Sequence, residues 1–183
     1  KENYRKYDLV WHSDKLEYYI KEFEYWIKQY SAFFPEKKVA YSTFSISDFK
    51  KEEYKKSNLN KIDDENVYDI GNTTIIIDNE ESYKIGYFNP IYFDAMNKGC
   101  LPFITSKHKY FHRLFEGIVI NDLKEMNYFI SSYGKLKNVI IEEIFQRIEN
   151  ATSSMKTGGR MAPRVTSPTR RSEARIERAE HVL

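Results

Sequence analysis

Short apolar strands alternate with amphipathic helices along most of this chain, and this alternation limits the fold more than any other feature. The clearest strand is Thr73 to Asp78, which is β-branched and almost continuously apolar, as strands covered on both faces are. Similar short apolar runs predict four more strands, at 7–12, 38–44, 101–105 and 117–121. Apolar spacing and capping residues predict helices at 15–30, 90–98, 107–115, 122–133 and 136–148. The pattern predicts an α/β fold, a Rossmann-like parallel sheet flanked by helices.

Residues 45–67 interrupt this alternation. They are rich in Lys, Asp, Glu and Asn and have little apolar pattern. We expect them to form a loop or a weak, exposed helix.

The composition changes near Ala151, and the change predicts two regions. Residues 151–183 contain no aromatic residue and have seven basic and three acidic side chains, against 22 basic and 24 acidic in residues 1–150. We therefore expect a Rossmann-like domain over 1–150 and a basic tail of low structure over 151–183. The overall net charge of +2 comes from this tail. The slightly acidic body gives no reason to expect a nucleic-acid partner.

The totals indicate a folded protein of a reducing compartment. Hydrophobic residues make up 41% and aromatic residues 16% of the chain, enough for a substantial core. A single cysteine, Cys100, rules out an internal disulfide framework. No apolar run has the ~20 residues of a membrane helix, and the first residues do not form a signal peptide. We expect a cytoplasmic location, and the absence of an initiator Met suggests that the chain begins inside a longer parent.

Residues 78–106 carry the most informative local pattern. Asn89 suits the capping position of a helix, and Pro90 suits its first residue, where a missing N–H costs nothing. Gly99 is placed to end that helix. Asp94 would project from the first turn. A helix N-terminus after a strand, with a carboxylate close by, is a local geometry that holds a phosphate and a ribose.

Polar residues also follow the other predicted strands. Ligands of open α/β sheets bind outside the carboxyl ends of the strands. This rule selects the loop 79–89 and eight residues: His12, Ser13, Asp78, Asn79, Thr105, Ser106, Asn121 and Asp122. We expect them to form one rim.

The run Gly86-Tyr-Phe-Asn-Pro-Ile-Tyr-Phe-Asp-Ala-Met-Asn-Lys-Gly-Cys-Leu-Pro-Phe-Ile-Thr105 resembles a known family. It looks like the C-terminal, donor-binding domain of GT-B glycosyltransferases of the group-1 type, and most like their spore-maturation-like branch. That branch carries a pattern close to Gly-Tyr-x-Asn-Pro-Arg-x-Phe-Glu-Ala-x-Ala-x-Gly-x-Leu-Pro-Ile. The run Leu114 to Asp122 resembles the next strand and its loop, and the resemblance extends over residues 68–148.

The resemblance implies a nucleotide-sugar as donor, a cell-surface glycan or similar acceptor, and no cofactor. Asp94 takes the place of the acid that hydrogen-bonds the ribose hydroxyls, and backbone N–H groups near Asn89 to Tyr92 would face the diphosphate. Ile91 stands where the family has Arg, and Gly86 where it often has a paired acid. The predicted donor-binding residues are Gly86, Tyr87, Phe88, Asn89, Pro90, Asp94, Thr105 and Ser106. Neither a catalytic residue nor a metal ligand is assigned.

A GT-B enzyme has two Rossmann-like domains, and 183 residues have room for one. We therefore expect the donor-binding half of such an enzyme, with a further N-terminal domain or a second copy of the chain as partner.

Several features have simpler interpretations. Asp94 would stabilise a helix N-terminus without any ligand. His108 and His112 have the spacing of a metal pair, but Lys107, Lys109 and Arg113 around them suggest a solvated basic face, which could touch an anionic membrane surface. The aromatic residues between 19 and 30 suit a core or an exposed interface. The alternative function is therefore a non-catalytic α/β interaction module that docks on another chain through this helix.

Overall fold

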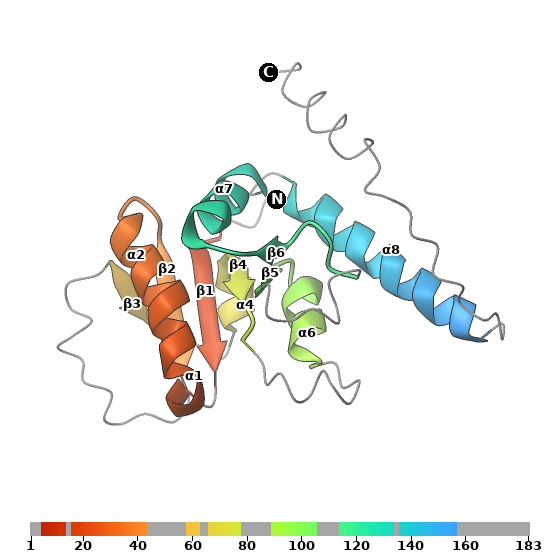
Figure 1. The fold of residues 1–183 in the computed structure, drawn as a ribbon, viewed down its shortest axis with the longest axis horizontal. Helices are drawn as coiled ribbons and strands as arrows, with labels where there is room; N and C mark the ends of the chain where they lie inside the picture. The colour runs from red at the N-terminus through yellow and green to blue at the C-terminus, as the bar shows by residue number, and fades with distance from the viewer. Residues whose placement is uncertain are drawn as a thin grey trace, which may run out of the picture. The chain divides into compact units, whose positions relative to one another are not determined.

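The computed structural model describes residues 5–13, 16–43, 58–62, 66–77, 89–105, 114–133 and 136–156 (Figure 1). Contacts divide the chain into two compact units, Lys1–Ile148 and Glu149–Leu183. The sheet and its helices belong to the first unit. Of the second unit, the structure describes only the end of the last helix.

Six strands form the sheet in the described part of the first unit, and all five pairings between them are parallel. The strand order is β3-β2-β1-β4-β5-β6. The strands are β1 (Tyr7–Ser13), β2 (Val39–Thr43), β3 (Leu59–Lys61), β4 (Gly71–Ile75), β5 (Leu101–Thr105) and β6 (Val119–Ile120). The predicted α/β fold with a Rossmann-like parallel sheet is confirmed.

One face of the sheet is covered by the helical run after β1 and by α7 (Leu123–Tyr133). That run consists of α1 (Leu16–Phe23), a π-helical turn η1 (Glu24–Lys28) and α2 (Gln29–Phe33), and it lies along β1 and β2 in Figure 1. Phe23 packs on Trp11 of β1 and on Tyr41 of β2, which are partners in register. Phe129 of α7 stacks on Phe103 of β5 with centroids 6.3 Å apart.

The opposite face carries α4 (Val67–Ile70), α6 (Ile91–Asn97) and the first part of α8 (Lys137–Lys156). His12 follows Trp11 and therefore points to this face, where its ring meets Tyr68 of α4. Phe93 of α6 stacks on Phe145 of α8 with centroids 6.2 Å apart. The helices after β1 and β4 thus lie on opposite faces. Right-handed crossovers place these helices on opposite faces, because the strand order runs outward from the centre of the sheet first on one side and then on the other.

The core fills both faces with large apolar side chains. Trp11, Phe23, Tyr30, Phe103 and Phe115 are among its fully buried members. Burial of one such side chain contributes roughly 1.5–3 kcal/mol. The predicted apolar face of the first helix is therefore core at Phe23, Trp26, Ile27 and Tyr30.

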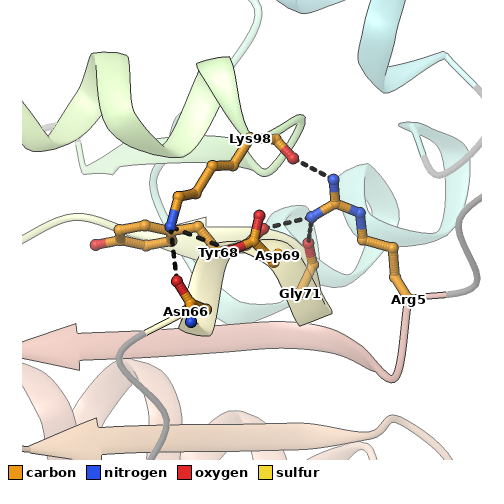
Figure 2. A network of polar contacts seen from close by, with 6 residues as sticks. All are labelled: Arg5, Asn66, Tyr68, Asp69, Gly71 and Lys98. Atoms are coloured by element: carbon orange, nitrogen blue, oxygen red, sulfur yellow. Dashed lines mark hydrogen bonds and ion pairs between the residues drawn. The ribbon is translucent and has the colours of Figure 1, made fainter.

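An arginine ties three segments together at the amino edge of the sheet, where the strands begin (Figure 2). Arg5, just before β1, donates to the carbonyl oxygens of Tyr68, Gly71 (2.9 Å) and Lys98. Tyr68 lies within α4, Gly71 is the first residue of β4, and Lys98 directly follows α6. Gly99 has a φ of +69°, and a Cβ there would lie 2.9 Å from Arg5 Nη2, so both the backbone and the arginine favour glycine at this position.

Several predicted boundaries are wrong. Residues 58–62 and 66–70 hold β3 and α4 rather than a loop or a single exposed helix. The strand predicted at Thr73–Asp78 runs from Gly71 to Ile75, because its pairing with β1 already starts at Tyr7 and Gly71. The strand predicted at 117–121 is only Val119–Ile120, since Leu114 to Gly117 form turns. The helix predicted to end at 148 continues to Lys156.

The other predicted elements need little change. The helix predicted at 15–30 runs on to Phe33 and ends before Pro35. The strand at 101–105 and the helices at 90–98 and 122–133 are confirmed to within a residue at either end. Most of the helix predicted at 107–115 lies outside the described residues, as does the tail after 156.

Candidate functional site at the carboxyl edge of the sheet

The strand order places a reversal at the centre of the sheet. From β1 the chain moves outward to β2 and β3, and after β4 it moves outward on the other side to β5 and β6. The carboxyl ends of β1 and β4 therefore lie at the point where ligands of doubly wound sheets bind. His12 and Ser13 end β1, and Ile75 ends β4, followed by Ile76 and Ile77 as the last described residues before the gap.

The start of α6 has the predicted capping geometry. Pro90 already has helical dihedral angles (φ −56°, ψ −21°), and Asn89 Oδ1 accepts the backbone N–H of Ile91 at 3.1 Å. The N–H of Tyr92 donates to the Asn89 carbonyl at 3.3 Å. Asn89 thus supplies a side-chain acceptor at the helix start, as predicted, but the helix begins at Ile91 with Pro90 in the cap position, one residue later than predicted. The same contacts use N–H groups that were expected to face a diphosphate, so a phosphate there would have to compete with Asn89.

Asp94 lies in the first turn of α6 with an exposed side chain. Its carboxylate makes no hydrogen bond or ion pair with any described residue, whereas Lys98, one turn further on, is engaged. Lys98 Nζ lies 3.1 Å from Asp69 Oδ2 and 3.4 Å from Asn66 Oδ1, both at α4. These contacts hold the end of α6 against α4, so Asp94 stands one turn closer to the carboxyl edge than this anchor.

Tyr68 on α4 is a candidate residue that the sequence did not indicate. Its side chain is 6% exposed, and its ring meets His12 edge to face with centroids 6.2 Å apart. In Figure 2 the phenol oxygen points away from Arg5, in the direction in which β1 runs. Burial raises the pKa of Tyr68 well above its usual value, and the nearby Cys100 and Asp94 raise it further. The phenol therefore remains protonated and can donate a hydrogen bond.

The remaining predicted rim residues divide into three groups. Thr105 ends β5 and is buried, so it contributes to the core beneath the edge. Asn121 and Asp122 serve α7 instead of a ligand: Asp122 Oδ1 accepts the N–H groups of Lys124 (2.9 Å) and Glu125 (2.8 Å), and Asn121 donates to Glu125. Six residues lie outside the described ranges: Asp78, Asn79, Gly86, Tyr87, Phe88 and Ser106.

The polar cluster at the amino edge is structural. Arg5 is occupied by carbonyl oxygens and Lys98 by Asp69 and Asn66, while Lys137 Nζ donates to Asn72 Oδ1 at 2.8 Å. Cys100 lies here and is fully buried, and burial raises its thiol pKa to about 12. A buried, protonated thiol does not act as a nucleophile.

Within the described ranges, no group of three or more His, Cys, Asp or Glu side chains could hold a metal ion. His108 and His112 lie outside those ranges. No helix in the described part of the chain is both long enough and apolar enough to cross a bilayer. Comparisons with protein families, with curated proteins and with solved structures found no match.

Proposed function

We propose that this chain is the donor-binding half of a cytoplasmic glycosyltransferase of the GT-B type, or such an enzyme itself. It would bind a nucleotide-sugar at the carboxyl edge of the sheet and support sugar transfer to a glycan acceptor. The observation that carries the proposal is the position of Asp94. This exposed carboxylate has no described partner, and it lies on the helix that follows β4, beside the reversal in strand order.

The fold supports the proposal because a six-stranded parallel sheet in this order is a common framework for nucleotides. An unengaged carboxylate suits ribose recognition, since it accepts hydrogen bonds from two hydroxyls. Asn89 fixes the start of α6 and therefore fixes where Asp94 stands.

The proposed chemistry depends on binding and positioning. Sugar transfer requires the donor to be held in one geometry and the leaving diphosphate to be stabilised. Asp94 would hold the donor in place by accepting hydrogen bonds from its ribose hydroxyls. The N–H groups at the start of α6 already donate to Asn89, so other groups would have to bind most of the diphosphate.

Titration calorimetry with UDP, GDP and their sugars tests the proposal. We expect at least one nucleotide to bind, and Asp94→Ala to weaken that binding by at least about tenfold, because hydrogen bonds to a charged group are worth ~1.5–3 kcal/mol. Glu142→Ala is the matched control, since Glu142 is an exposed carboxylate on α8. Failure of the wild-type chain to bind any of these nucleotides would count decisively against the proposal.

A non-catalytic interaction module is the second candidate, and exposed aromatic side chains favour it. Tyr18, Tyr25 and Phe33 on the α1–α2 run are 74%, 47% and 66% exposed. This candidate predicts self-association that is lost when Tyr18, Tyr25 and Phe33 are changed to Ser. Light scattering after size exclusion measures the mass, and nucleotide binding would be absent.

A further inference from the structure

Tyr68 points a hydrogen-bond donor toward the edge of the sheet at which α6 and Asp94 begin (Figure 2). Its ring is buried on the face of the sheet that carries α4, against His12, and its backbone carbonyl is held by Arg5 at the amino edge. The side chain therefore has a fixed base and a fixed ring. Its hydroxyl extends in the direction in which β1 runs (Figure 2).

The contacts between α4 and α6 join the two helices that carry Tyr68 and Asp94. Lys98 binds Asp69, the neighbour of Tyr68, and Asp94 precedes Lys98 by four residues on the same side of α6. Lys98 thus joins α6 to α4, and Asp94 stands on α6 one turn nearer the carboxyl edge. Asp94 is also among the charges that raise the pKa of the Tyr68 phenol, after burial and Cys100.

Neither group is used elsewhere in the described residues. The Tyr68 hydroxyl donates to no described acceptor, and the Asp94 carboxylate has no described hydrogen-bond or ion-pair partner. A phenol donor on a rigid ring beside a carboxylate acceptor matches two adjacent hydroxyls. One hydroxyl oxygen accepts from the phenol, and the hydroxyls donate to the carboxylate.

We propose that Tyr68 is a second residue of the ligand site, which with Asp94 recognises a vicinal diol, the ribose 2′- and 3′-hydroxyls of the bound nucleotide. The inference rests on the proposed nucleotide-binding function. It adds to that function a residue that lies outside the quoted run Gly86 to Thr105.

Calorimetry on the full chain tests this with Tyr68→Phe, which removes the hydroxyl and keeps the ring on His12. The probes are UDP and GDP, each compared with its 2′,3′-dideoxy form. We expect Tyr68→Phe to weaken binding of the ribonucleotide about fivefold, the size of one net hydrogen bond. Binding of the dideoxy form should not change. In the Asp94→Asn background, the effect of Tyr68→Phe should shrink, because both residues hold one diol.

The outcomes separate this inference from the function beneath it. If the wild-type chain binds a nucleotide but Tyr68→Phe weakens the ribo and dideoxy forms equally, or weakens neither, the role of Tyr68 is refuted and the nucleotide site stands. If the wild-type chain binds neither nucleotide, both fail together. Thermal unfolding of Tyr68→Phe, expected to match the wild type, shows whether a loss of affinity reflects the missing hydroxyl or a damaged fold.

Discussion

Two neighbouring threonines on β4 should respond in opposite directions to the same substitution. Thr73 and Thr74 are both buried, with 1% and 0% of their surfaces exposed. Thr73 Oγ1 donates to the carbonyl oxygen of Asp8 at 2.6 Å, which ties β4 to β1. Thr74 Oγ1 points to the opposite face and has no hydrogen-bond partner among the described residues. Each residue therefore serves as the matched control for the other.

The magnitudes follow from this difference. Thr73→Val removes a hydrogen bond and leaves the Asp8 carbonyl without that donor, so we expect a loss of about 1 kcal/mol in the free energy of unfolding. Thr74→Val replaces an unsatisfied hydroxyl, whose burial costs roughly 1–3 kcal/mol in proteins, by a methyl group of similar size. We expect Thr74→Val to stabilise the protein by about 1 kcal/mol. The two variants should differ by about 2 kcal/mol.

Equilibrium unfolding in urea measures both variants. Trp11 and Trp26 are buried, so their fluorescence reports loss of the core. The midpoint should fall for Thr73→Val and rise for Thr74→Val, with the slope unchanged. If Thr74→Val destabilises the protein as much as Thr73→Val does, the Thr74 hydroxyl has a partner, such as an ordered water, and the reasoning fails.

Two further predictions concern the amino edge. Arg5→Met removes three donations to carbonyls and should cost about 3 kcal/mol, against about 1 kcal/mol for Arg147→Met, whose well-formed bond goes to the Glu116 carbonyl at 2.9 Å. Equal losses in urea unfolding would show that Arg5 is no special anchor. Cys100 should resist a thiol reagent at pH 8 in the native protein and react at once in guanidinium, because burial raises its pKa to about 12. Its folded pKa of about 12 lies above the ordinary value of 9.0, so its contribution to stability is complete below about pH 9 and is lost as the pH rises toward 12. Prompt labelling of native protein at pH 8 would contradict this account.

The elements that the sequence predicts well are those whose signals are local. Asn89, Pro90 and Gly99 mark α6 through capping chemistry that needs no distant partner, and the apolar run at 101–105 marks β5 to the residue. Asp122 predicts the start of α7 for the same reason. Asn121 and Asp122 also show the limit of the strand-end rule, because their side chains are used to cap the next helix.

The missed elements lack such signals. β3 has the sequence Leu-Asn-Lys, and as an edge strand it needs only one neighbour and little apolar surface. α4 has four residues, too few to show a helical period. Tyr68 was missed with it, because its position depends on how α4 packs against β1 and how Lys98 draws α6 toward α4.

The two edges of the sheet differ in how far their polar groups are already engaged. At the amino edge, Arg5, Lys98 and Lys137 all have protein acceptors, so substitutions there should lower stability. At the carboxyl edge, Asp94 and the Tyr68 hydroxyl have no acceptor or donor among the described residues, so their removal should change stability little. Groups that the fold does not need for its own stability are the ones left to contact a ligand. If Asp94→Asn instead lowered the unfolding midpoint as much as Arg5→Met, Asp94 would be a structural residue, and the proposed site would lose its central contact.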